Sequence, residues 1–427
     1  MTHLLRTLSL TLGLPAGWLF ALGLSAQTDI VSLAPHPDPK GVSAPFAGHT
    51  PQGLLVAGGC NFPDVPAAEG GKKVFYDKVY RLSLNAQLPE ASAWDTLPSL
   101  PDSLAYGTMA TTAQGLVCVG GRTPRGMSCA TFLINAHGLV DRLPPLPVKM
   151  AEGCAVALGD DVYVCGGEQD GGQCGLYRLR TNASTGWERL KDYPGTPRLQ
   201  PVLATDGRAL YLMGGFYFNK DKQRCILPED ISVYHPDTDK WRRQGRLPKR
   251  PDCRRRGLVG ATAVSVGETI YVAGGVNPDL FGQAVEGHAP ADYLRQDPQW
   301  YGFNDGLWTF HTATGRWQTV LTDDRLARAG GVVTTDGHRL YMICGETKPG
   351  IRSPQITAID IGNYSAIALH LNPRLKYTAK RPIKRQNKVS IFLAYVRYFL
   401  YLYTYERASY GYFKSAARHD GRDAVDA

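Results

Sequence analysis

The sequence of 427 residues lacks the patterns of several large protein classes. It contains no heptad repeat and no long helical stripe, which excludes a coiled coil or a helical bundle. None of its nine cysteines has the CxxC or Cys/His spacing of a zinc site. What remains is an ordinary globular composition, with 10% aromatic and 20% charged residues.

The body of the chain also has almost no net charge. The formal charge is +9, but residues 363–427 hold twelve Lys/Arg and four Asp/Glu, which leaves 35 basic and 34 acidic residues before them. A nucleic-acid-binding domain needs a basic stripe on its folded surface. We therefore expect no nucleic acid among the partners.

The cysteines do not predict a disulfide framework. Cys118, Cys165 and Cys344 lie inside apolar, strand-like runs, where buried free thiols are expected. A disulfide stays open among four cysteines in loop-like stretches, namely Cys129, Cys174, Cys225 and Cys253.

The N-terminus has the pattern of an export signal. Arg6 supplies a short basic region, an apolar run broken by Pro15 follows over residues 8–24, and Ser25-Ala26 offers small residues for cleavage. The pattern predicts a signal peptide over residues 1–26, a mature chain that starts at or near Gln27, and a periplasmic location. An uncleaved anchor is the alternative.

Glycine and proline are abundant, with 47 and 29 residues. They suit many short strands joined by tight turns, because Gly accepts positive φ and Pro fixes other turn geometries. An apolar run that ends in a glycine pair recurs every 46 to 70 residues. The copies are LLVAGG at Gly58-Gly59, LVCVGG at Gly120-Gly121, VYVCGG at Gly166-Gly167, LYLMGG at Gly214-Gly215, IYVAGG at Gly274-Gly275 and LYMICGE at Cys344-Gly345.

Each unit has the same internal order. A strand with small residues precedes the glycine-pair strand, a third strand follows it, and the fourth strand often contains a Trp. These tryptophans are Trp94, Trp187, Trp241 and Trp317. The pattern resembles the Kelch repeat and predicts an all-β fold, a six-bladed Kelch-type β-propeller over residues 27–362.

The two ends of this region predict how the ring closes. The sixth unit contains PQITAIDI but no Trp-type fourth strand of its own. The segment 29–34 (DIVSLA) precedes the first blade and is the natural missing strand. A ring has no exposed sheet edge only if one blade combines strands from both ends. We therefore expect closure in blade six.

One local motif goes beyond the fold. The stretch GETKPGIR at Gly345–Arg352 resembles the active-site motif of the bacterial N-acetylneuraminate epimerase (sialic acid mutarotase) family. GVSAPFAG at Gly41–Gly48, GGVNPDLF at Gly274–Phe281 and the Pro197-Arg198 opening of blade four are similar to segments of the same family. The resemblance covers about residues 30 to 360.

The order of the blades departs from the usual family. Its first blade resembles the third blade here, and its last two resemble the first two. This circularly permuted order is typical of the cyclically permuted mutarotase branch. Permutation is tolerated in a ring because each blade contacts only its neighbours.

The resemblance implies a mutarotase that interconverts the α and β anomers of a free sugar, with N-acetylneuraminate as the expected substrate and no cofactor or metal. It assigns proton transfer to Glu346 and implies that Arg352 binds the sugar carboxylate in a bidentate manner. For Glu346 the alternative is a solvated loop residue.

Four other residues are weaker candidates for substrate binding. Arg198 and Asn277 lie in loops that resemble the family, but an inter-blade hydrogen bond is the alternative role for each. Arg122 and Glu168 follow glycine pairs and are candidates for lining the pocket.

Other functional classes share this fold. A non-catalytic Kelch propeller that binds a glycan or a protein would not need Glu346. A copper radical oxidase needs a Tyr–Cys crosslink and two His ligands, and the sequence offers no convincing His set. A sialidase is disfavoured because the SxDxGxTW turn repeat is absent.

Residues 363–427 do not resemble the propeller. A basic stretch at 374–388 precedes an apolar, aromatic stretch at 389–405 that Arg397 interrupts. One interpretation is a segment at the membrane surface, the only part of the chain expected to contact a membrane. We favour an extension outside the propeller, whose removal after Gly362 would leave stability and activity nearly unchanged.

Overall fold

The structure is a computed structural model that describes residues 30–84, 92–171, 174–182 and 185–362. The predicted signal peptide and the C-terminal tail lie outside these ranges. Within them, no helix has the length and apolar character that a membrane span requires.

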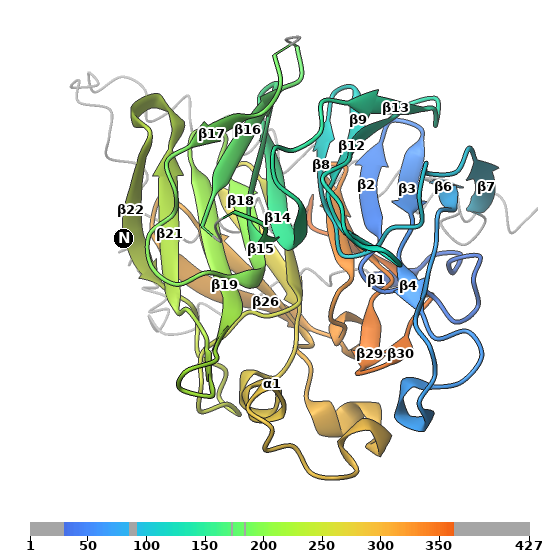
Figure 1. The fold of residues 1–427 in the computed structure, drawn as a ribbon, viewed down its shortest axis with the longest axis vertical. Coiled ribbons are helices and arrows are strands. Elements are labelled where there is room, and N and C mark those ends of the chain that lie inside the picture. The colour runs from blue at the N-terminus through green and yellow to red at the C-terminus, as the bar shows by residue number, and fades with distance from the viewer. Residues whose placement is uncertain (1–29, 85–91, 172–173, 183–184, 363–427) are drawn as a thin grey trace, which may run out of the picture. The chain divides into compact units, whose positions relative to one another are not determined.

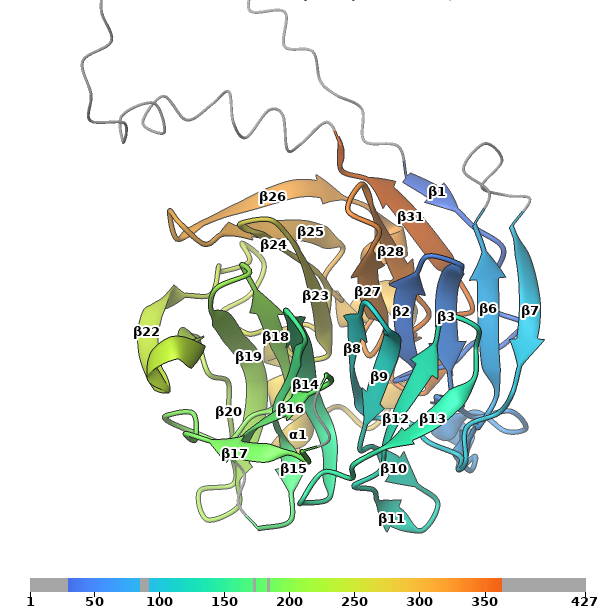
Figure 2. The same ribbon diagram turned by 90° about the horizontal axis from the view of Figure 1, so that it is seen from above.

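Six antiparallel sheets follow one another around a common axis, as Figure 2 shows. From the innermost strand outward, blade 1 contains β2 (Phe46–Thr50), β3 (Gly53–Ala57), β6 (Val79–Ser83) and β7 (Ala93–Leu97). Blade 2 contains β8 (Thr108–Thr112), β9 (Gly115–Val119), β12 (Thr131–Asn135) and β13 (Val140–Leu143). Blade 3 contains β14 (Met150–Leu158), β15 (Asp161–Gln169), β16 (Leu176–Arg180) and β17 (Glu188–Leu190).

The other three sheets complete the ring. Blade 4 contains β18 (Leu199–Thr205), β19 (Leu210–Asn219), β21 (Asp230–His235) and β22 (Lys240–Arg246), with β20 (Arg224–Ile226) paired to the end of β19. Blade 5 contains β23 (Ala261–Val266), β24 (Thr269–Gly274), β25 (Gly306–His311) and β26 (Arg316–Thr322). Blade 6 contains β27 (Val332–Thr335), β28 (Arg339–Ile343), β31 (Ile356–Asp360) and β1 (Ile30–Ser32). The prediction of a six-bladed propeller is confirmed.

Ring closure also follows the prediction. Strand β1 from the N-terminal end pairs antiparallel with β31, with Ile30 opposite Ile359 and Ser32 opposite Thr357. Blade 6 therefore combines strands from both ends of the described chain, so that β31 is paired on both sides and the blade has four strands like its neighbours.

The hydrophobic core is divided among the blade interfaces. One cluster of buried side chains lies at each of the six interfaces between neighbouring blades. The second strand of a blade faces both neighbours, and all five residues of β3 and of β9 are buried. This two-sided burial explains why the glycine-pair strands are continuous apolar runs instead of alternating ones.

The four repeated tryptophans join neighbouring blades. Each indole Nε1 donates a hydrogen bond to a backbone carbonyl at the outer end of the preceding blade, such as Trp187 to Pro144 at 2.9 Å and Trp241 to Lys191 at 2.9 Å. The equivalent bonds of Trp94 to Pro35 and Trp317 to Arg246 measure 2.7 and 3.1 Å. The four tryptophans are half-buried, and these bonds satisfy their N–H groups.

The glycine pairs bring the blades together near the axis. The second glycine of each pair, or Gly345 in blade 6, donates its N–H to a carbonyl of the next blade, as Gly121 does to Met150 at 2.7 Å. Gly121 has φ 105°, and a Cβ there would lie 2.8 Å from the Ala105 carbonyl oxygen. Only glycine accepts this conformation and this close approach.

A second repeat surrounds the axis itself. At the start of the innermost strand of every blade, one residue adopts the left-handed conformation, with φ between 51° and 63°. These six axial positions are Ala44, Tyr106, Glu152, Gln200, Gly260 and Gly330. Backbone hydrogen bonds connect several of them from blade to blade, including Tyr106 N–H to Ala44 at 3.0 Å and Glu152 N–H to Tyr106 at 2.7 Å.

Most of the remaining elements follow the glycine pairs. They are β4 (Cys60–Asn61), β5 (Val74–Phe75), β10 (Arg122–Thr123), β11 (Gly126–Met127), α1 (Pro278–Val285), β29 (Glu346–Lys348) and β30 (Ile351–Arg352), with short 3-10 turns at Ala67–Glu69, Tyr293–Arg295 and Pro298–Tyr301. Of these, β4, α1, β29 and β30 lie in the lower part of Figure 1. Two further 3-10 turns lie at Pro236–Thr238 and Asp324–Leu326. Of these loops, those of blades 5 and 6 contribute residues to the lining of the axial cavity.

Candidate active site

A cavity of about 710 Å³ follows the propeller axis. Its walls are the innermost strands of the six blades, and the loops of the strand-end face cover one end. Among its lining residues are Tyr106, Glu152, Gln200, Tyr293 and Glu346.

Glu346 and Arg352 meet in this region. They are paired across the short hairpin of β29 and β30, which turns through Pro349 and Gly350. Arg352 Nη1 donates to Glu346 Oε2 at 2.7 Å. The hairpin explains the spacing of six residues, because it returns the chain so that both side chains project together.

Arg352 is packed behind Glu346. Its side chain is 4% exposed, whereas that of Glu346 is 24% exposed and lines the cavity. Arg352 Nε donates to the Cys60 carbonyl at 3.4 Å, and the guanidinium carbon lies 5.0 Å from the centroid of the Phe62 ring. The guanidinium is thus held against the Phe62 ring behind Glu346, and Arg352 itself is not among the residues that line the cavity.

The carboxyl group of Glu346 is electrostatically unusual. Burial raises the pKa of Glu346 above its ordinary value, and Arg352, the Gly350 amide and Lys73 only partly offset this. A carboxyl group with a raised pKa holds and releases protons closer to neutrality than a solvated one. This is the property that general acid–base catalysis needs.

Tyr106 and Lys73 extend the site. Lys73 Nζ donates to the Tyr106 hydroxyl at 2.8 Å and lies 4.8 Å from the centroid of its ring. Burial, with the nearby Cys60 thiol, raises the pKa of the Tyr106 hydroxyl, so the phenol stays neutral. Arg352 and Lys73 together make this end of the cavity electropositive.

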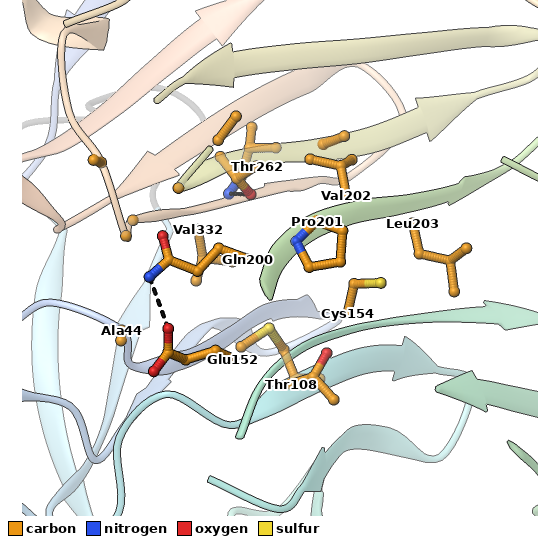
Figure 3. A pocket seen from close by; sticks show the side chains of 18 of the residues that line it. Ala44, Thr108, Glu152, Cys154, Gln200, Pro201, Val202, Leu203, Thr262 and Val332 are labelled. Carbon is orange, nitrogen blue, oxygen red and sulfur yellow. Dashed lines mark hydrogen bonds between the residues drawn. The ribbon is translucent and has the colours of Figure 1, made fainter. Parts of the chain in front are cut away.

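Arg122 and Glu168 lie in a second polar cluster. Arg122 Nη2 donates to Glu168 Oε2 at 2.5 Å and to Glu152 Oε1 at 3.2 Å. Gln200 Nε2 donates to the other oxygen of Glu152 at 2.9 Å, as Figure 3 shows. Of these four residues, Glu152 and Gln200 line the cavity. Arg122 and Glu168 stand behind Glu152.

Arg198 has a different environment. Its side chain is 1% exposed, and its Nη2 donates to both carboxylate oxygens of Asp230 at 3.0 Å. Nη1 reaches the carbonyls of Gly214 and Asp230. These contacts join strands of one blade, so the geometry supports a structural role and we place Arg198 outside the candidate site.

Asn277 is the N-cap residue of helix α1. Its side-chain oxygen accepts hydrogen bonds from the backbone N–H groups of Asp279 and Leu280 at the start of α1. Pro278 occupies the first helical position, where its missing N–H costs nothing. The capping contacts account for the Asn-Pro-Asp sequence without a ligand.

Sequence reasoning missed Tyr106, Glu152 and Gln200. A signal for them exists: the inner strands open on LAYG, MAEG, RLQP, LVGA, RAGG and VSAP, and the third letter of each is the axial position. The letter varies from Gly to Glu, so the repeat is visible only when the six strands are aligned in register.

The cysteines of the propeller are free thiols. Cys118, Cys165 and Cys344 are buried, as expected, and the loop cysteines form no disulfide. Across the described ranges, no cluster of three or more His, Cys, Asp or Glu is placed to hold a metal ion.

The fold and the hairpin define a six-bladed propeller with a carboxyl–guanidinium site at its axis. Comparison with known proteins agrees. Residues 143–379, more than half of the chain, match the family model described as N-acetylneuraminate epimerase. The chain therefore belongs to the N-acetylneuraminate epimerase family. The match begins at the end of β13, just before blade 3, the blade that we expect to correspond to the family's usual first blade.

Curated relatives that are similar to part of this chain carry the same name. The N-acetylneuraminate epimerase of Haemophilus influenzae (strain PittEE) is 32% identical over 238 residues, which are 53% of this chain and 60% of the relative. That of Yersinia enterocolitica is 31% identical over 245 residues, or 53% and 59%. The chain thus spans about 60% of the length of these curated relatives. A solved structure, "Structure of YjhT", superposes with a TM-score of 0.55 at 15% identity and covers 78% of this chain and 98% of that one, which supports the fold alone.

Proposed function

We propose that this protein interconverts the α and β anomers of a free sugar acid, with N-acetylneuraminate as its substrate. The observation that carries the proposal is Glu346, a carboxyl group with a raised pKa that lines the axial cavity beside a buried arginine. The names of the relatives support the substrate.

The reaction needs proton transfer at two oxygens. The anomeric hydroxyl loses a proton, the ring C–O bond breaks, and the ring oxygen gains a proton, which gives the open-chain keto acid. Rotation about the adjacent C–C bond and reclosure give the other anomer. Glu346 moves the proton, and general acid–base catalysis of this kind is worth about 10²–10⁴-fold.

Arg352 binds the sugar carboxylate. In this sugar the carboxylate is bonded to the anomeric carbon, so the guanidinium must lie close to the proton-transfer group, and its Nη1 is 2.7 Å from Glu346. A ligand carboxylate beside Arg352 adds negative charge near Glu346. This charge raises the pKa of Glu346 further, because like charges disfavour ionisation.

Proton NMR of freshly released α-N-acetylneuraminate tests the proposal directly. We expect the α signal to convert to the β signal faster with the protein than without it. If the rate with the protein equals the rate without it, for this sugar and for other free sugars, the mutarotase function is contradicted. A non-catalytic propeller is then favoured.

We also propose that the protein acts in the periplasm after removal of residues 1–26. The apolar run and the small residues before Gln27 support this. N-terminal sequencing of exported protein should find a start at or near Gln27, and a retained Met1 would contradict it.

A further inference from the structure

The axial positions divide the cavity into two unlike halves. All six have the same left-handed backbone, a conformation that is strained for residues other than Gly. Blades 5 and 6 place Gly260 and Gly330 there, which bring no side chain to the cavity wall. Blades 2, 3 and 4 place long side chains there instead: Tyr106, Glu152 and Gln200. Strained positions with large side chains are typical of functional sites.

Glu152 lies on the wall opposite Glu346. The innermost strands pack in the cyclic order β2, β8, β14, β18, β23, β27, with β27 next to β2. The strand of Glu152, β14, is therefore three blades from β27 in either direction, and the Glu346 backbone is bonded to Ala329 just before β27. Both carboxyl groups line the same cavity.

Glu152 is held in a fixed orientation. Arg122 contacts one carboxylate oxygen at 3.2 Å and Gln200 contacts the other at 2.9 Å, while the side chain keeps 17% exposure toward the cavity. Glu168 fixes Arg122 from behind at 2.5 Å. A carboxylate has about four lone-pair sites, so Glu152 can accept further hydrogen bonds from a ligand.

The charged groups near the two opposite walls of the cavity differ in their balance of sign. Near Glu346 the two cations Arg352 and Lys73 outnumber that one carboxyl group, whereas on the other side the carboxyl groups of Glu152 and Glu168 outnumber Arg122. A sugar acid with its carboxylate at the anomeric carbon therefore points that end toward Arg352. Its uncharged hydroxyl-bearing end then faces Glu152.

We propose that Glu152 and Gln200 form a hydroxyl-binding subsite that holds the polyol end of the substrate across the cavity from Glu346. This inference rests on the proposed function. Glu152 accepts hydrogen bonds from exocyclic hydroxyl groups, and the Gln200 amide keeps the carboxylate aligned and lies ready to contact the same groups. The pair selects sugar acids with a hydroxylated side chain and takes no part in proton transfer.

The test compares E152Q with wild type on two sugars. One is N-acetylneuraminate, and the other is its analogue with the exocyclic polyol chain shortened to remove its hydroxyls. For N-acetylneuraminate we expect KM to rise about ten- to a hundredfold, the size of a hydrogen bond to a charged group, with kcat nearly unchanged. On the shortened sugar, E152Q and wild type should have similar KM values.

A matched variant separates binding from structure. E188Q makes the same change on the outer strand β17 of the same blade, at a residue that pairs with Arg178 and does not line the cavity. It should keep the wild-type KM ratio between the two sugars. If E152Q folds poorly, Gln200→Met carries the same test with a smaller expected rise in KM.

The proposal is overturned if E152Q keeps the wild-type KM, if KM rises by the same factor on both sugars, or if E188Q reproduces the rise in KM. A failure of the mutarotase function itself is distinguishable. In that case wild type converts no anomers, and titration calorimetry with N-acetylneuraminate replaces the kinetic test. Weaker binding by E152Q than by wild type supports the subsite, and equal binding overturns it.

Discussion

Two arginine–carboxylate pairs of similar length behave differently in this propeller. Arg198 and Asp230 lie within blade 4, with two contacts of 3.0 Å, and Arg352 and Glu346 lie in the hairpin beside the axial cavity, with one contact of 2.7 Å. Burial opposes ionisation of both carboxyl groups. In Asp230, Arg198 and the Ser232 hydroxyl outweigh burial, and the pKa falls below its ordinary value. In Glu346, burial dominates and the pKa rises.

The difference lies in how completely each carboxylate is satisfied. Asp230 accepts a bidentate arginine and a hydroxyl, the arrangement that best stabilises a charged carboxylate. Glu346 shares its arginine with the Cys60 carbonyl and the Phe62 ring. An ion pair that satisfies both partners is structural, whereas one that leaves its carboxyl group in need of a proton is suited to chemistry.

The largest expected effect is on Glu346. Glu346→Gln keeps the shape and hydrogen-bonding capacity of the side chain but removes proton transfer, so the rate of anomer conversion should fall about 10²–10⁴-fold. Proton NMR after subtraction of the spontaneous rate measures this, with Glu188→Gln as a control that keeps full activity. A wild-type rate in Glu346→Gln would show that another group moves the proton.

The second expected effect is on stability and concerns Arg198. Arg198→Met leaves Asp230 without its partner inside blade 4, which should cost about 3 kcal/mol of the free energy of unfolding. Denaturant unfolding gives the value. Arg246→Met removes an exposed partner of Glu229 in the same blade and should cost less than about 1 kcal/mol.

Substrate affinity completes this test of the structural assignment. The folded fraction of Arg198→Met should bind N-acetylneuraminate with the wild-type affinity, because the Arg198 guanidinium already donates its hydrogen bonds to the Asp230 carboxylate and two carbonyls. Lost affinity with unchanged stability would reverse the assignment and return Arg198 to the substrate site.

Sequence patterns predicted what is local and repeated. The glycine pairs, the four tryptophans and the closing strand at Ile30–Ser32 each follow from packing rules that act within one blade or between neighbours. The hairpin that joins Glu346 and Arg352 is also local, since only six positions separate the two residues. These parts of the fold and site were therefore accessible without a structure.

The opposite wall of the cavity was not accessible in the same way. The partner of Arg198 is 32 residues away, and Glu152 meets Gln200 from a different blade. At the axial positions the backbone conformation repeats but the side chain does not, so no residue type marks them. Which polar residues share a cavity depends on the ring as a whole.

The third prediction uses the pH dependence of activity to test the raised pKa of Glu346. In the proposed mechanism the Glu346 carboxylate accepts the proton, so kcat/KM should fall as pH drops through its raised pKa, at a pH above the ordinary value of 4.5. Arg352→Met removes a positive charge that favours ionisation and should move this acid limb to higher pH, whatever the loss in rate. Arg352→Lys keeps the charge and should leave the limb near its wild-type position while weakening substrate binding, because Lys cannot grip a carboxylate with two parallel bonds.

Stability should respond with opposite signs at the two sites. Asp230 has a lowered pKa, so its ionised form stabilises the fold above the ordinary value of 3.8, and this contribution is lost as pH falls. Glu346 has a raised pKa, so its ionisation destabilises the fold, and Glu346→Gln should gain stability relative to wild type as pH rises above 4.5. Denaturant unfolding across this range measures both, and equal slopes for wild type and Glu346→Gln would contradict the raised pKa.

The smallest expected effect concerns Lys73, which sharpens the comparison between a buried and an exposed charge. Lys73 also lowers the pKa of Glu346, but less than Arg352 does, and Lys73 is exposed to solvent. Lys73→Met should therefore move the acid limb of kcat/KM to higher pH by less than Arg352→Met does. Salt should screen the exposed charge more strongly than the buried one, so the wild-type and Lys73→Met limbs should converge as ionic strength rises. Lys72→Met, a change at the exposed neighbouring residue, is the matched control and should not shift the limb. A Lys73 shift as large as that of Arg352 and insensitive to salt would mean that Lys73 closes over Glu346 in the working enzyme.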